Sequence, residues 1–126
     1  MARQKHNAPV DLFLGDLPTE LIFKTLGIEL EVGRVVFSAA AQIHASRRHP
    51  NEFPMCLPYA GDIVTAPLYL GDDARNPGKI ECISRVPALR SGVLVALSLE
   101  PDEHGCYHVT SIYPIGYGKI EARRAS

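Results

Sequence analysis

Residues 44–49 (HASRRH) hold the side chains best suited to acid–base chemistry, with two His and two Arg in six positions. Histidine exchanges protons near neutral pH, and Arg binds phosphate through two parallel hydrogen bonds. Cleavage of RNA without a metal needs a base for the 2′-hydroxyl proton, an acid for the leaving 5′-oxygen, and a cation for the charged phosphorane. His44, His49, Arg48 and Arg47 supply these groups, so the stretch predicts a candidate centre.

A helix is expected to carry this stretch. Ser38 can cap its N-terminus, and residues 39–41 are three alanines, which have the highest helix propensity. Pro50 disfavours the helical conformation at His49, so we expect the helix to end near Arg48.

Helical spacing places His44 on one face with Arg47 and Arg48, and it turns Ile43 toward a core. His49 lies outside the helical period and can swing toward the same face. The alternative is that His44 packs on a sheet and both Arg are solvated surface charges, as in an ordinary surface helix.

A second group of polar residues lies in the last expected strand and just beyond it. Alternation along a strand puts His108 and Thr110 on one face, and Val109 and Ser111 on the other. Hydroxyl groups and a Tyr beside a basic cluster would position a phosphate or stack a base, although a solvated strand face is the alternative. From this group we take two candidate catalytic residues, Thr110 and Tyr113, and four candidate substrate-binding residues, His108, Ser111, Tyr117 and Lys119.

Composition indicates a single folded domain. The chain has 126 residues, 46% of them hydrophobic and 21% charged, which is ordinary for a globular protein. The formal net charge is -1, so any nucleic-acid binding would come from a local patch rather than from a generally basic protein. We expect a flexible tail over residues 1–9, one domain over 10–118, and a basic tail over 119–126 that is either a terminal helix or a frayed end.

The cysteines and the apolar runs suggest a location. Three Cys, at positions 56, 82 and 106, leave one unpaired in any disulfide scheme, which favours reduced, buried thiols, with a single bridge as the alternative. No apolar run approaches the length of a membrane span, and residues 1–9 lack the apolar core of a signal peptide. We expect a soluble, cytoplasmic protein with no membrane partner.

Metal and nucleotide sites have weaker support. His44, His49 and Cys56 could ligate zinc, with Glu52 or Asp62 nearby, but their intervals match no paired-ligand motif. The sequence contains no GxGxxG, P-loop or GxSxG motif, which argues against nucleotide-binding and serine-hydrolase functions. We expect neither a metal nor another cofactor.

The order of apolar and turn-forming segments predicts an α+β fold. In the first half we expect a short strand over 10–15, a helix over 19–26 ended by Gly27, a strand over 34–37, the helix described above, and a further helix within 56–67. Four strand candidates follow, joined by linkers too short for crossover helices: residues 68–71, 79–86, 92–100 and 106–115. We therefore expect N-terminal helices packed on a roughly four-stranded antiparallel sheet, with 92–100 as a central strand covered on both faces.

The chain resembles the phage-associated nuclease-like domains grouped with barnase, EndoU, colicin D and RelE. The resemblance spans residues 12–114 and depends on the order of five segments: LFLGDLP, VVFS, HASRRHP, the Ile-Val-x-x-Pro run at 63–67, and VTSIYP near the end. It implies a compact ribonuclease that needs no metal, often a toxin or a phage or prophage effector acting on tRNA or other RNA, with a cognate immunity or inhibitor protein. By position in the motifs, it implicates His44 and His49 together with Thr110 and Tyr113.

Two hypotheses follow. The first is an endoribonuclease that cleaves RNA by transesterification, giving a 2′,3′-cyclic phosphate and a 5′-hydroxyl, with one His as base and the other as acid. The second is a catalytically inactive module of the same fold that binds RNA or a protein. Convergence of His44, His49, Thr110 and Tyr113 on one open concavity would favour the enzyme.

Overall fold

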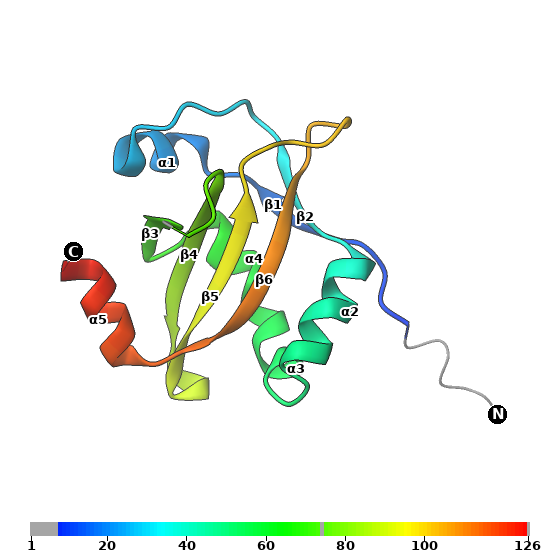
Figure 1. Ribbon diagram of the computed structural model, residues 1–126, viewed down its shortest axis with the longest axis vertical. Coiled ribbons are helices and arrows are strands. Elements are labelled where there is room, and N and C mark those ends of the chain that lie inside the picture. The colour runs from blue at the N-terminus through cyan, green and yellow to red at the C-terminus, as the bar shows by residue number, and fades with distance from the viewer. Residues whose placement is uncertain (1–7, 74, 126) are drawn as a thin grey trace.

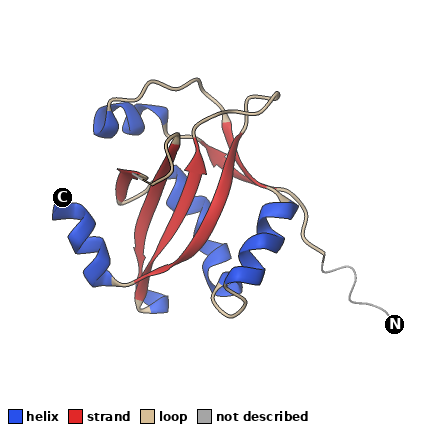
Figure 2. Cartoon of the chain, viewed as in Figure 1, coloured by secondary structure: helices blue, strands red, loops and turns tan. Residues whose placement is uncertain are grey.

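The computed structural model describes residues 8–73 and 75–125, which form one mixed six-stranded sheet with helices on both faces (Figures 1 and 2). In chain order the main elements are β1 (Leu12–Asp16), α1 (Thr19–Leu26), β2 (Arg34–Phe37), α2 (Ala39–Arg48), α3 (Phe53–Cys56), the 3-10 helix η2 (Leu57–Tyr59), α4 (Ala60–Thr65), β3 (Tyr69–Asp72), β4 (Lys79–Val86), the 3-10 helix η3 (Pro87–Leu89), β5 (Ser91–Ser98), β6 (Tyr107–Ile115) and α5 (Tyr117–Ala125). The predicted α+β class is confirmed.

The sheet has the strand order β1-β2-β6-β5-β4-β3. The predicted antiparallel meander is confirmed for β3 to β6. The prediction of about four strands was wrong, because β1 and β2 form a hairpin that joins the same sheet through a parallel pairing of β2 with β6. That pairing aligns Val35 with Tyr107 and Val36 with His108.

The helices divide between the two faces of the sheet. Apolar side chains of α1, α2, α3 and α4 pack with one face in the larger core, whereas Ile120 of α5 packs on the opposite face with Ile83, Leu94 and Ile115. Figure 1 shows α4 behind the sheet and α5 in front of it. The prediction that helices precede the sheet is therefore incomplete, since β1 and β2 alternate with the first helices and α5 follows the last strand.

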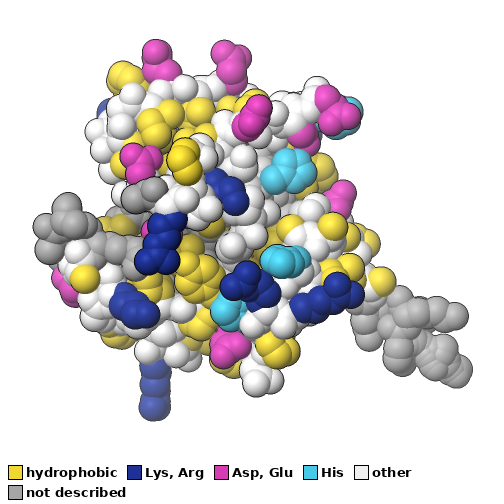
Figure 3. Space-filling model, viewed as in Figure 1, with side chains coloured by type: hydrophobic (Ala, Val, Ile, Leu, Met, Phe, Trp, Pro, Cys, Tyr) yellow, Lys and Arg dark blue, Asp and Glu magenta, His cyan; other side chains and the backbone are white. Residues whose placement is uncertain are grey.

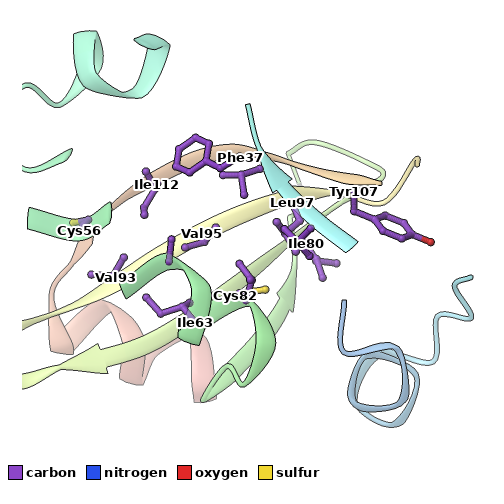
Figure 4. Close-up of a cluster of buried hydrophobic side chains, with 14 of the residues drawn as sticks. Phe37, Cys56, Ile63, Ile80, Cys82, Val93, Val95, Leu97, Tyr107 and Ile112 are labelled. Atoms are coloured by element: carbon purple, nitrogen blue, oxygen red, sulfur yellow. The ribbon is translucent and has the colours of Figure 1, made fainter. Parts of the chain in front are cut away.

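The larger core consists of aliphatic and aromatic side chains between the sheet and α1 to α4 (Figure 4). Phe37 lies edge-on to Phe53, with their ring centroids 6.0 Å apart. The central strand β5 is buried on both faces from Gly92 to Leu97, as its continuous apolar sequence predicts. Burial raises the pKa of the Cys82 thiol, which lies in this core, to about 12.

The expected helix within residues 56–67 is replaced by three short segments, α3, η2 and α4. Pro58 lacks a backbone N–H, so a continuous helical hydrogen-bond ladder cannot pass through it. The chain keeps right-handed helical dihedrals at Leu57 and Tyr59 while the hydrogen-bond pattern changes.

Of the predicted N-terminal tail, residues 1–7 lie outside the described part, and the predicted boundary after residue 118 falls inside α5. Ile120 of α5 is fully buried, so this segment packs on the body of the domain.

All three cysteines are free thiols; Cys56 and Cys82 are buried, and Cys106 is partly exposed. None of the described helices has the length and apolar composition needed to cross a bilayer.

Candidate functional site

Helix α2, which carries the His and Arg cluster, begins and ends where the sequence predicts. The Ser38 side chain accepts a hydrogen bond from the Ala41 N–H at 3.1 Å, and the Asp11 carboxylate accepts one from the Ala39 N–H at 2.8 Å. These two acceptors satisfy backbone donors that a free helix end leaves without partners. The helix is therefore held at its start by the segment that precedes β1.

Gln42 connects the buried side of α2 to the neighbouring backbone. Its buried amide nitrogen donates to the Val10 carbonyl at 2.7 Å and to the Phe37 carbonyl at 2.9 Å. Ala45 is also buried in the larger core, whereas Ile43 is 39% exposed. The prediction that Ile43 faces the core was wrong, because the polar Gln42 satisfies two backbone carbonyls and takes the inward position.

A β-bulge shapes the opposite wall of the site. Leu97 of β5 pairs with Val109, and Ala96 pairs with Ser111, so Thr110 is an extra residue without a partner in the register. The Thr110 hydroxyl donates to the Ala96 carbonyl at 3.3 Å. Strict alternation from residue 108 to 111 was therefore wrong, and Thr110 and Ser111 both line the same cavity.

The cavity between α2 and the sheet, which we call the site cavity, has a volume of about 450 Å³. It lies on the face that carries α5, where Glu81, Ala96 and Ser111 form one row across three paired strands. Six of the predicted residues line it: His44, Arg48, His49, Thr110, Ser111 and Tyr113.

His49 and Tyr113 bring the two predicted groups into direct contact. Their rings stack with centroids 5.5 Å apart and an interplanar angle of 22°. His49 is partly buried, while His44 and Arg48 are exposed. The stack restricts the orientation of the His49 imidazole, which is the requirement for a proton donor or acceptor that acts at a fixed position.

Five polar residues of the site cavity were missed by sequence reasoning, all from the segment between β3 and β5: Asp73, Arg75, Asn76, Lys79 and Glu81. The alternation of β4 does put Glu81 on the face opposite Ile80 and Cys82, but the sequence does not say which face holds the site. Asp73 accepts hydrogen bonds from the Asn76 amide at 2.9 Å and from the Arg75 N–H at 3.1 Å. The Asn76 hydrogen bond is the main cause that lowers the pKa of Asp73, so this carboxyl stays ionised.

Four predicted residues do not line the site cavity. Arg47 is exposed on α2, and Tyr117 and Lys119 are exposed on α5. His108 lies near the start of β6, where its Nε2 is 2.8 Å from Oδ2 of Asp102, a residue of the β5–β6 turn. The backbone N–H of Cys106, followed by His108, lowers the pKa of Asp102 to about 2.

The zinc alternative has no geometric support in the described part of the chain. Cys56, one of the three proposed ligands, is buried in the larger core rather than beside His44 and His49. Among the described residues, no group of three or more His, Cys, Asp or Glu side chains is arranged to hold a metal ion.

Side-chain types on this face are mixed. Figure 3 shows Lys, Arg and His side chains on both sides of a hollow in the surface over the sheet. The site cavity is lined by three cations, Arg48, Arg75 and Lys79, and by two carboxylates, Asp73 and Glu81. The cavity therefore combines cations for an anionic group with imidazole and carboxylate groups that can exchange protons.

Comparison with protein-family models, with characterised proteins and with solved structures finds no match to this chain.

Proposed function

We propose that the protein is a metal-independent endoribonuclease that cleaves RNA, with tRNA as one candidate, by transesterification. The observation that supports this proposal is the site cavity, because His44, His49, Arg48, Thr110 and Tyr113 all line it. An open cavity that contains two imidazoles, cations and hydroxyls provides the groups that the reaction needs.

The reaction transfers two protons and replaces one bond from phosphorus to oxygen with another. A base removes the proton of the 2′-hydroxyl, the 2′-oxygen bonds to phosphorus, the bond from phosphorus to the 5′-oxygen breaks, and an acid protonates the departing oxygen. We assign these roles to His44 as base and His49 as acid, while the reverse assignment uses the same residues. Glu81 on the cavity floor is a further candidate for the base.

The remaining residues bind the phosphate. Arg48 lies on the same helix as His44 and lines the cavity, so it is the cation we assign to the phosphorane. Thr110 and Ser111 place hydroxyl groups at the bulge of β6, across the cavity from α2. We assign them to orientation of the scissile phosphate.

The test is an incubation of the purified protein with tRNA and with a single-stranded oligoribonucleotide in excess EDTA, with analysis of the product ends. Replacement of either catalytic His, His44→Ala or His49→Ala, is expected to lower turnover by about 10² to 10⁴, the usual contribution of a general acid or base. His104→Ala is the matched control, because His104 is exposed and lies outside the site cavity. Unchanged turnover in both folded site variants would refute the assignment.

The alternative is a catalytically inactive module that binds RNA or a protein through the same cavity. Two carboxylates, Asp73 and Glu81, line the cavity beside its cations, and such charge pairing also suits a protein ligand. Tight RNA binding without any product ends would favour this alternative. Action in the cytoplasm as a toxin or phage effector, and control by a cognate inhibitor protein, belong to the same proposal.

A further inference from the structure

The site cavity does not end at Tyr113. A second cavity, which we call the adjoining cavity, has a volume of about 920 Å³ and extends from Tyr113 toward the start of α5. The two cavities share five lining residues: Asp73, Arg75, Asn76, Glu81 and Tyr113. They are therefore neighbouring parts of one groove on the sheet face.

Two helices bound this groove. Helix α2 contributes His44 and Arg48 at one end, and α5 with the segment before it contributes Gly116, Gly118 and Lys119 at the other. In Figure 1 α5 lies to the left of β4 and α2 to the right of β6, so the two helices flank the central strands of the sheet. The two cavities together extend from His44 on α2 to Lys119 on α5.

Cations lie at both ends of the groove. Arg48 and Lys79 line only the site cavity, Arg75 lies where the cavities meet, and Lys119 lines only the adjoining cavity. Consecutive phosphates of one RNA strand are bound by cations spaced along the groove. A single bound phosphate would leave Lys119, at the far end of the groove, without a role. Beside Arg75 and Lys119, the adjoining cavity is lined by three carboxylates, Asp72, Asp73 and Glu81. Next to them a sugar or base with hydroxyl or amino donors fits better than a phosphate.

We propose that the adjoining cavity is a second nucleotide subsite, so that the substrate is single-stranded RNA with at least one nucleotide beyond the two that flank the scissile phosphate. This inference rests on the proposed ribonuclease function. Lys119 contacts the phosphate of the additional nucleotide. A duplex does not fit this arrangement, because its stacked and paired bases cannot enter a groove that follows a single backbone.

The first experiment compares oligoribonucleotides of different length. The values of kcat/KM are measured for a dinucleotide and for trinucleotides extended on the 5′ or the 3′ side. We expect one of the two extensions to raise kcat/KM by about tenfold, the usual effect of one charge-assisted contact. In Lys119→Ala the ratio of kcat/KM for the trinucleotide to kcat/KM for the dinucleotide is expected to fall toward one. The control is Lys24→Ala, which should keep the wild-type ratio because Lys24 is an exposed residue on α1.

Annealing provides a second comparison. A longer oligoribonucleotide is tested alone and after pairing with its complement, and pairing is expected to lower cleavage at least tenfold. Equal kcat/KM for dinucleotide and trinucleotides, an extension gain that survives in Lys119→Ala, or equal cleavage of paired and unpaired RNA would each overturn the second subsite.

Failure of the proposed function is separable from failure of this inference. If no RNA is cleaved, binding of non-cleavable 2′-O-methyl oligonucleotides is measured by fluorescence anisotropy over the same lengths. Affinity that increases with length in the wild type and in Lys24→Ala, but not in Lys119→Ala, would support the groove without catalysis. Affinity that does not depend on length or on Lys119 would overturn it.

Discussion

At the residue scale, the contact between His49 and Tyr113 shows how the site is assembled. A residue at the end of α2 and a residue of β6 stack with an interplanar angle of 22°, so the strand constrains an imidazole that the helix supplies. In the proposed function Tyr113 would therefore act as a positioning residue for His49.

Two replacements of Tyr113 distinguish the contribution of its ring from that of its hydroxyl. In Tyr113→Phe the ring still stacks on His49, so we expect kcat to stay within about threefold of wild type. In Tyr113→Ala the imidazole loses its support, and we expect kcat to fall by about tenfold to a hundredfold with a smaller change in KM. Steady-state kinetics on one oligoribonucleotide tests this; an equal loss in both variants would instead assign the role to the hydroxyl.

The composition of the site could be predicted only in part. His44, Arg48 and His49 lie within six residues of one another, so their types and spacing reveal them. Glu81 and Lys79 belong to β4 and reach the cavity only through the pairing of β4 with β5 and β5 with β6. A carboxylate in an alternating strand gives no local sign of the residues that lie across two neighbouring strands.

At the element scale, local signals account for the boundaries that were predicted well. Gly27 adopts the left-handed conformation that ends α1, with φ of 73°, and Ser38 caps α2. The parallel pairing of β2 with β6 could not be predicted, because it joins segments from opposite halves of the chain and neither contains a mark of its partner. The bulge at Thr110 is likewise a property of pairing rather than of strand sequence.

The cap of α2 is expected to contribute measurably to stability. Replacement of Ser38 by Ala removes the acceptor for the Ala41 N–H and should lower the free energy of unfolding by about 1 kcal/mol. Ser46→Ala, within the same helix, is the control, because Ala has the higher helix propensity and no loss is expected. Urea unfolding of both variants measures the difference; a loss as large in Ser46→Ala would contradict the capping role.

The β5–β6 turn is expected to weaken in acid. Asp102 accepts hydrogen bonds from the N–H groups of His104 and Cys106, and its pKa is about 2 instead of 3.8. Because the folded-state pKa is lowered, ionised Asp102 stabilises the fold above about pH 4, and this contribution disappears as the pH falls toward 2.

Thermal unfolding between pH 2 and 6 tests this dependence. Asp102→Asn should have a lower Tm than wild type at pH 5 to 6, with a difference that shrinks as the pH approaches 2. Asp16→Asn is the control, since Asp16 is an exposed carboxylate outside this turn. A difference between wild type and Asp102→Asn that stays constant over the whole range would contradict the role of the ionised carboxylate.

At the scale of the whole molecule, a net charge of -1 coexists with a local group of cations in the site cavity. In the proposed function, long-range attraction of RNA would therefore be weak, and binding would depend on a few contacts at short range.

This charge distribution predicts a shallow dependence on salt. Arg48, Arg75 and Lys79 in the site cavity and Lys119 in the adjoining cavity together can neutralise four phosphates, and each contact with single-stranded nucleic acid contributes a slope of about −0.7. A plot of log affinity against log salt concentration for a 2′-O-methyl oligonucleotide that spans both cavities should therefore have a slope of about −3. Fluorescence anisotropy between 50 and 200 mM salt measures it, roughly the range in which counterion release is usually observed. A slope steeper than about −5 would indicate a much larger basic surface than the site cavity offers.

The parallel pairing of β2 with β6 also determines when the centre can exist during synthesis. Helix α2 is synthesised before β6, and the bulge that places Thr110, Ser111 and Tyr113 forms only when β6 inserts between β2 and β5. A nascent chain that ends before residue 107 therefore has His44 and His49 without the opposite wall of the cavity. The proposed ribonuclease would therefore be inactive until β6 has been synthesised and has paired with its neighbours.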